Sequence, residues 1–330
     1  MVGEVNCTGT AREPDRSPVS GPASWLGRVT SPVVGDDGSG SWLLPSSRTG
    51  HSLTGAGRRT VADVDASTAS PAPAISETAA PTLSGGQLDE VLTLLPGSDS
   101  VELKVTVPEV ARRRVMERLE MDPMRGELRQ VAYFDTPDLR LNQQGLVLRA
   151  RRVQRKPGDS VVKLRPVVPA NLTTDLRRRP GFGVEIDAMP GGFVCSARMK
   201  AAADDDLVRD VFRGQAPVRK IFTKHQRALF EAHAPAGTTL DDLVVLGPLN
   251  IVKLKFRAEG YPRRIVAELW FYPDGSQILE LSAKCGPTEA FTAAAETKAF
   301  LASRGVDLAA AQQTKTRTAL ELLTSVQRAT

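Results

Sequence analysis

Charged and apolar side chains alternate along several short segments of this chain. Residues 101–107 read V-E-L-K-V-T-V, which places Glu102, Lys104 and Thr106 on one face of an extended strand. A sheet with such a face can close into a barrel with a charged interior, which suits a polyanion together with a divalent metal ion. The same alternation gives five further charged faces: Arg149 with Arg151, Lys163 with Arg165, Glu185 with Asp187, Lys253 with Lys255, and Glu280 with Ser282 and Lys284.

The composition limits the kinds of site that the chain can carry. The net charge of +5 is uneven, because residues 1–85 contain no Lys, six Arg and eight Asp or Glu, so that the remainder carries +7. The three cysteines, Cys7, Cys195 and Cys285, form no C-x-x-C motif, which argues against a disulfide framework or a structural zinc site. Since the chain has only three His, we expect carboxylates to hold any metal, and oxygen ligands favour Mg²⁺ or Mn²⁺.

The chain is predicted to consist of a disordered extension, residues 1–85, and one folded domain, residues 86–330. The extension is rich in Gly, Ser, Pro, Thr and Ala and shows no hydrophobic periodicity. No run of about 18 apolar residues predicts a membrane span, and the N-terminal residues lack the pattern of a signal peptide. Together with the sparse cysteines, these features favour a cytoplasmic protein.

The folded part is predicted to be α+β, a closed or nearly closed antiparallel eight-stranded β-barrel with helices packed outside. Short turns link most of its strands, among them a turn at residues 156–159. The outward apolar faces would be covered by helices or by a second subunit, which leaves a homodimer open. Strands are predicted at residues 101–107, 130–134, 145–154, 160–165, 183–188, 246–257, 264–272 and 277–284, with a long strand or a strand pair at 218–233. Helices are predicted at residues 108–121, 197–212, 288–304 and 314–327.

One block of the sequence resembles the CYTH family, the triphosphate tunnel enzymes. Residues 133–152 read Y-F-D-T-P-D-L-R-L-N-Q-Q-G-L-V-L-R-A-R-R, similar to the family's aromatic-Asp-Thr-Pro turn followed by a Gly-Leu-x-Leu-Arg-x-Arg strand. V-V-K-L-R-P at 161–166, E-I-D at 185–187 and T-K-T-R-T-A-L at 314–320 resemble further family elements in the expected order. The resemblance covers roughly residues 98–325 and implies an eight-stranded antiparallel barrel, open at both ends, that binds a triphosphate inside.

The resemblance also implies a role for each charged face. Lys104 and Glu102 would form the catalytic pair, with Lys104 stabilising charge or helping to activate water. Lys224 and Arg227 are three residues apart, so on a regular strand only one of them would point inward. Basic side chains would bind phosphate: Arg149, Arg151, Lys163, Arg165, Lys224, Arg227, Lys253, Lys255, Lys315 and Arg317. Carboxylates would hold one or two Mg²⁺ or Mn²⁺ ions: Glu102, Glu185, Asp187, Glu268 and Glu280.

The chain departs from the family pattern at several of its acidic positions. Ser100 takes the place of the first Glu of the family's E-x-E-x-K strand, and the strand that follows L-D-D-L-V-V-L-G carries Lys253 and Lys255 where the family has two Glu. Glu268 and Glu280 are followed two residues later by Trp270 and Ser282. The remaining carboxylates therefore have a second interpretation, as ion-pair partners of the neighbouring basic side chains without metal.

Three functions follow from these observations. The first is a metal-dependent phosphohydrolase acting on an inorganic or organic triphosphate, in which water attacks a terminal phosphorus in line. The second is an adenylate cyclase of the class IV type, which releases cyclic AMP and pyrophosphate. The third is a non-catalytic polyphosphate or nucleotide binder, favoured by the missing carboxylates. Nucleic acid is a less suitable partner, because the chain has few aromatic side chains on which bases could stack.

Overall fold

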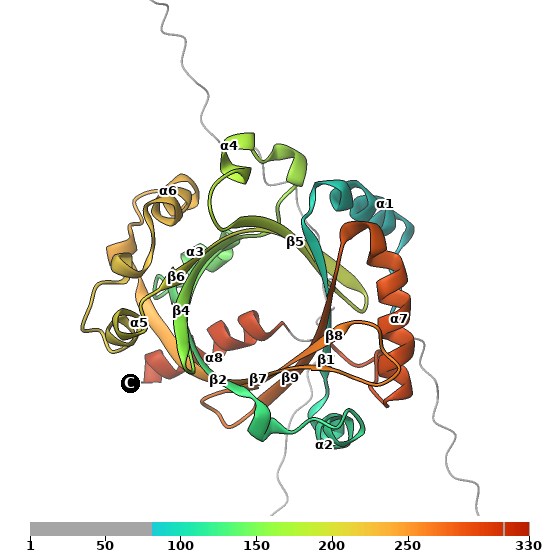
Figure 1. Cartoon of the computed structure of the whole chain (residues 1–330). Coiled ribbons are helices and arrows are strands. Elements are labelled where there is room, and N and C mark those ends of the chain that lie inside the picture. The colour runs from blue at the N-terminus through green and yellow to red at the C-terminus, as the bar shows by residue number, and fades with distance from the viewer. Residues whose placement is uncertain (1–80, 313, 330) are drawn as a thin grey trace, which may run out of the picture. The chain divides into compact units, whose positions relative to one another are not determined.

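The computed structural model describes residues 81–312 and 314–329, in which nine strands close into one barrel (Figure 1). Around the barrel the strands follow the order β1-β5-β6-β4-β3-β2-β7-β8-β9, and β9 pairs with β1 to close the ring. The strands are β1 (Ser100–Val107), β2 (Glu127–Asp135), β3 (Leu146–Val153), β4 (Lys156–Leu164), β5 (Phe182–Met189), β6 (Gly192–Ala203), β7 (Val244–Arg257), β8 (Arg264–Phe271) and β9 (Gln277–Cys285).

The barrel confirms the prediction of a closed barrel with helices and corrects its strand count and direction. Nine strands are present among the described residues where eight were predicted, and the β1–β5 pair is parallel while the other neighbours pair antiparallel. The parallel pair is short and runs from Ser100 opposite Glu185 to Leu103 opposite Ala188. It brings the charged faces of the first and fifth strands together on neighbouring strands of the barrel.

The ninth strand comes from a segment that the sequence predicted to be helical. Residues 197–212 are rich in Ala and Asp, yet Gly192–Ala203 forms β6, and the helix α5 begins only at Asp205. The strand pairs with β4 on one side and β5 on the other, and these two ladders override the helix propensity of Ala. Asp204 caps α5 by accepting a hydrogen bond from the backbone N–H of Leu207.

The prediction of strand at residues 218–233 is wrong, because this segment forms a short 3₁₀ turn and the helix α6 (Lys224–His233). Thr223 and Gln226 form a capping box, the local signal that decides for a helix. The buried side-chain amide of Gln226 also donates hydrogen bonds to the carbonyls of Ser160 and Met199. These bonds fasten α6 to the outside of β4 and β6.

The hairpin between β3 and β4 is tighter than predicted. The turn consists of Gln154 and Arg155, and the residues 156–159 that were predicted as a turn extend β4 instead. Asp159 thereby lies opposite Arg151 in the ladder. The two side chains form a pair of hydrogen bonds of 2.8 Å each.

Helices cover the outward apolar faces of the strands, as expected. α5 and α6 pack on β3 and β4, where Val208 and Phe230 are buried against Leu148 and Val162. α2 and α7 cover β1, β8 and β9, and α1 lies over the β1–β5 region (Figure 1). The helices are α1 (Gly85–Leu94), α2 (Glu109–Arg118), α3 (Arg140–Gln143), α4 (Thr174–Arg177), α5 (Asp205–Phe212), α6 (Lys224–His233), α7 (Ala290–Ser303) and α8 (Lys315–Ala329).

The last helix, α8, lies across one end of the barrel rather than on its outer wall (Figure 1). Leu320 and Leu323 pack in one buried cluster with Tyr133, Leu249 and Trp270 of the barrel strands. The interior therefore differs from the expected tunnel with two open ends, because apolar contacts with α8 close one of them.

The structure tests the predicted N-terminal disorder and the predicted absence of a membrane span only in part. The predicted disorder of residues 1–85 falls, up to residue 80, outside the described residues and stays a prediction. Among the helices that are described, none combines the length and the apolar character needed to cross a membrane.

Candidate functional site

The barrel encloses a cavity of about 510 Å³ whose lining is strongly cationic. All nine strands and the start of α8 contribute side chains to it. Of the described side chains that line it, thirteen are basic and five are acidic, an excess of eight positive charges. The basic ones are Lys104, Arg129, Arg149, Arg151, Lys163, Arg165, Arg198, Lys200, Lys253, Lys255, Arg264, Lys284 and Lys315. The acidic ones are Glu102, Glu185, Asp187, Glu268 and Glu280.

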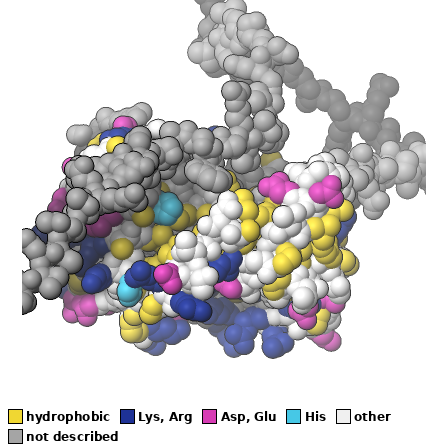
Figure 2. Space-filling model, turned by 90° about the horizontal axis from the view of Figure 1, so that it is seen from above, with side chains coloured by type: hydrophobic (Ala, Val, Ile, Leu, Met, Phe, Trp, Pro, Cys, Tyr) yellow, Lys and Arg dark blue, Asp and Glu magenta, His cyan; other side chains and the backbone are white. Residues whose placement is uncertain are grey.

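Most of the predicted site residues thus lie together in one cavity, whereas Lys224, Arg227 and Arg317 do not line it. Lys224 and Arg227 lie on α6, outside the barrel, so the prediction that one of them points inward is wrong. The side chain of Arg317 is 79% exposed and pairs with Glu321 along α8. Figure 2 shows further Lys and Arg side chains along the lower edge of the outer face that it views, with Asp and Glu among them.

The sequence interpretation missed several basic side chains of the cavity. Arg198 and Lys200 were assigned to a helix, although they alternate correctly for a strand. Arg264 has the same parity along β8 as Glu268, so the alternation was a sufficient signal for it. Lys284 was placed on the charged face of Glu280, as the structure has it, but was given no role in phosphate binding.

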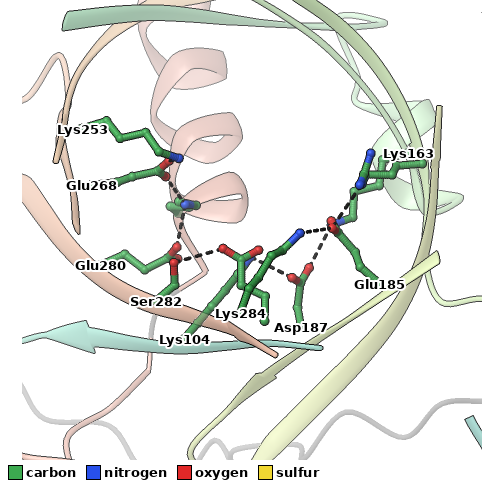
Figure 3. Close-up of polar contacts among 12 residues, drawn as sticks. Lys104, Lys163, Glu185, Asp187, Lys253, Glu268, Glu280, Ser282 and Lys284 are labelled. Carbon is green, nitrogen blue, oxygen red and sulfur yellow. Dashed lines mark hydrogen bonds and ion pairs between the residues drawn. The ribbon is translucent and has the colours of Figure 1, made fainter. Parts of the chain in front are cut away.

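A first group of ion pairs surrounds Asp187 and Glu185 on β5 (Figure 3). The Nζ atom of Lys163 lies 2.8 Å from Asp187 Oδ2 and 3.1 Å from Glu185 Oε1, and the Nζ atom of Lys104 lies 2.8 Å from Asp187 Oδ1. Burial opposes the charged form of Glu185, but Lys163 and the other cations around it lower its pKa to about 2. Lys104 and Lys163 likewise hold the pKa of the buried Asp187 far below its ordinary value.

A second group surrounds Glu268 and Glu280 (Figure 3). The Nζ atom of Lys253 lies 2.6 Å from Glu268 Oε1. Lys315, which projects inward from the start of α8, pairs with Glu268 Oε2 and lies 2.6 Å from Glu280 Oε1. Burial disfavours the charged form of Lys315, yet the two carboxylates raise its pKa, so that it stays an ammonium ion.

A third group is cationic and has no acidic partner. Among the described residues, the side chains of Arg149 and Arg165 form no hydrogen bond or ion pair, and the buried atoms Arg149 Nε and Tyr133 Oη lack a hydrogen-bond partner. Burial lowers the pKa of Arg165 and the charge of Arg149 adds to this, although the charges of Tyr133 and Asp187 partly oppose it. Because unpaired buried charges are costly, these two guanidinium groups and the phenol form a site that an anion would stabilise. By contrast, Arg151 is already paired with Asp159.

Glu102 is the most accessible carboxylate of the cavity. Its Oε1 accepts a hydrogen bond of 3.0 Å from the hydroxyl of Ser282, and its Oε2 lies 3.5 Å from Lys104 Nζ. The side chain is 22% exposed, compared with 10% for Glu185 and 7% for Asp187. Glu102 is therefore the carboxylate with the greatest freedom to accept a proton or a new ligand.

The side chains as placed do not fit a bound divalent cation. A hard ion needs several converging oxygen ligands, but the described part of the chain contains no group of three or more His, Cys, Asp or Glu arranged to hold a metal. Both carboxylate oxygens of Glu185, Asp187 and Glu268 already contact a Lys or Arg nitrogen. The predicted Mg²⁺ or Mn²⁺ site therefore stays a prediction, and no chemical step is derived through it.

Comparison with known proteins yields only distant similarity. No protein-family model matches the chain, and no curated protein matches it. Solved structures with a similar fold include a candidate adenylate cyclase from Bacillus halodurans, 13% identical, covering 67% of this chain and 97% of its own at a TM-score of 0.47. Another is a candidate adenylyl cyclase from Hippeastrum with a dominant triphosphatase activity, 14% identical, covering 68% and 95% at a TM-score of 0.49. Similarity at this level does not bear on the function of the present chain.

Proposed function

We propose that the barrel binds a triphosphate or a short linear polyphosphate, free or attached to a small molecule. The observation that carries this proposal is the unpaired cationic group of Arg149, Arg165 and the Tyr133 hydroxyl inside an enclosed cavity. A guanidinium group donates two parallel hydrogen bonds to a phosphate, and a phenol adds a third donor. A polyanion would therefore satisfy donors that the protein itself leaves unsatisfied.

The volume of the cavity and the distribution of its charges support a small anion. A volume of about 510 Å³ lies in the range of small-molecule sites. Exposed basic side chains such as Lys255 and Arg264 line the same cavity as the inner arginines, so positive charge continues from the accessible part to the interior. Tyr133 packs in the buried cluster that α8 forms with one end of the barrel. The group of Arg149, Arg165 and Tyr133 therefore lies towards that closed end. A phosphate chain would then enter with one end first.

A phosphohydrolase is the second candidate, and the position of Glu102 favours it. In that reaction Glu102 would accept a proton from water while the water oxygen forms a bond to the terminal phosphorus and the bridging P–O bond breaks. Lys104, 3.5 Å from Glu102, would stabilise the negative charge that develops on the phosphate oxygens. No observation on the described residues separately favours the cyclase reaction, in which a ribose hydroxyl would take the place of water.

Calorimetric titration of the full chain with tripolyphosphate, ATP and thiamine triphosphate tests the binding proposal. Arg149→Ala should weaken the binding of every ligand that wild type binds, because it removes an unpaired cation from the cavity. Arg113→Ala is the matched control, since the side chain of Arg113 is 93% exposed on α2 and outside the cavity. Absence of binding by wild type, or equal affinities of wild type and Arg149→Ala, would refute the proposal.

A product assay with the same three compounds tests the catalytic candidates. Phosphate release indicates a phosphohydrolase, and cyclic AMP with pyrophosphate indicates a cyclase. Glu102→Gln should abolish turnover without weakening ligand affinity, because it removes the proposed base together with a negative charge that repels the ligand. Running the assay with chelator and with Mg²⁺ or Mn²⁺ tests the predicted metal requirement directly.

A further inference from the structure

Four of the five acidic side chains of the cavity occur in two pairs, and one lysine ammonium group contacts both members of each pair (Figure 3). Lys163 contacts Glu185 and Asp187 at 3.1 and 2.8 Å. Lys315 contacts Glu268 and Glu280, the latter at 2.6 Å. A bridging position between two carboxylates is the place that a divalent cation with oxygen ligands would need.

Additional ammonium groups complete both arrangements. Lys104 contacts the second oxygen of Asp187 at 2.8 Å, and Lys253 contacts the second oxygen of Glu268 at 2.6 Å. An ammonium group has three donors, so that one lysine can bridge two carboxylates by directed hydrogen bonds. The carboxylates are thus neutralised by cations that belong to the chain itself.

We propose that Lys163 and Lys315 take the place of divalent cations, so that the barrel binds its polyanion without metal. This inference rests on the proposed polyphosphate binding for its ligand. The bridged carboxylates then hold the lysines in position, and the excess of eight positive charges provides the attraction that a metal would otherwise supply. Free Mg²⁺ neutralises polyphosphate in solution and therefore competes with the barrel for it.

The proposed role of Lys315 can be tested by a substitution that changes no strand of the barrel. Lys315 belongs to α8, whereas its two partners lie on β8 and β9. Its side chain is 15% exposed and also lies over the ring of Trp270, with Nζ 5.2 Å from the ring centroid. Lys255 lines the same cavity but is exposed and has no ion pair among the described residues, so it provides a matched control.

The first arm of the test measures metal uptake without phosphate. Full-length wild type, Lys315→Met, Lys163→Met and Lys255→Met are titrated with Mn²⁺, and free Mn²⁺ is followed by electron paramagnetic resonance. Wild type and Lys255→Met should take up none, whereas removal of either bridging ammonium should create one Mn²⁺ site per chain. Stoichiometric uptake by wild type, or no gain in either bridging variant, overturns the assignment. Two bridging variants are used so that misfolding of one leaves the test intact.

The second arm measures tripolyphosphate affinity by calorimetry in chelator and in Mg²⁺. The affinity of wild type in chelator should equal or exceed that in Mg²⁺. A loss of about tenfold or more on removal of metal, 1.4 kcal/mol, overturns the inference. If tripolyphosphate binds under neither condition, the proposed function fails, while the Mn²⁺ titration still decides whether the lysines replace metal.

Discussion

Replacement of Glu185 by Gln should change stability and ligand affinity in opposite directions. The carboxylate of Glu185 contacts three cations, with Lys163 at 3.1 Å, Arg198 at 3.2 Å and Lys284 at 3.4 Å. Gln keeps the shape of the side chain but removes its negative charge. The folded protein then loses three attractions, whereas a bound polyanion loses one repulsion.

The size of both effects follows from the structure. Burial alone would raise the pKa of Glu185, but the surrounding cations outweigh it and lower the pKa from 4.5 to about 2, which corresponds to about 3 kcal/mol of stability at neutral pH. Solvent screens this side chain little, because it is 10% exposed. For a domain of this size the melting temperature should fall by roughly 6–12 °C. For a phosphate bound at an assumed separation of about 8 Å and an effective dielectric of about 20, Coulomb's law gives about 2 kcal/mol for a unit charge, so affinity should rise by about tenfold or more.

Thermal unfolding followed by circular dichroism measures the first effect, and calorimetric titration with tripolyphosphate at low salt measures the second. Glu321→Gln is the control, because Glu321 forms an exposed ion pair with Arg317 on α8, worth at most about 1 kcal/mol. The reasoning is refuted if Glu185→Gln melts at the wild-type temperature, or if it binds tripolyphosphate more weakly than wild type.

Three further predictions concern acid, the anion site and the closed end. The pKa values of Glu185 and Asp187 are lower in the folded protein than in the unfolded chain, so both carboxylates stabilise the fold fully at pH values above about 4. This contribution is lost as the pH falls towards about 2. Equal free energies of unfolding at about pH 6 and pH 3, measured in urea, would contradict this. Arg149→Ala should cost about 2–5 kcal/mol of tripolyphosphate binding and Arg149→Lys less, because an ammonium group keeps the charge but loses the bidentate geometry; titration of both variants checks the order. Leu320→Ala should destabilise the protein by about 2–5 kcal/mol, because Leu320 is buried against the barrel end; a urea midpoint equal to that of wild type would show that α8 does not close the barrel.

The strands with strict alternation were predictable from the sequence, and the strands without it were not. V-E-L-K-V-T-V at 101–107 specifies both a strand and its inward face, and β1 confirms it. β6 alternates only over residues 195–200, and the following Ala201 to Ala203 favour a helix locally, so that pairing with β4 and β5 decides for a strand. The error at residues 218–233 has a local cause, since the capping box of Thr223 and Gln226 was present in the sequence.

Strand alternation predicted which side chains of the recognised strands line the cavity, but it did not predict which of them form ion pairs with one another. Lys163 on β4 reaches Glu185 on β5 across β6, the strand that lies between them. Such a contact depends on the closed ring and cannot be deduced from spacing along the chain. The engagement of Arg151 by Asp159 was missed for a simpler reason, because Asp159 was assigned to a turn.

The division of charges inside the barrel indicates how stability and binding can be separated in one cavity. Lysines neutralise the carboxylates in two compact groups, and these contacts are made whether or not a ligand is present. Arg149 and Arg165 are partly buried and have no such partners among the described residues, so a bound anion would offset the unfavourable free energy of their burial. The strength of ligand binding should therefore depend on the unpaired arginines, and the stability of the free protein on the bridged carboxylates. A polyanion placed against the arginines would leave both lysine bridges intact, so we expect the proposed ligand to bind without displacing the cations that neutralise the carboxylates.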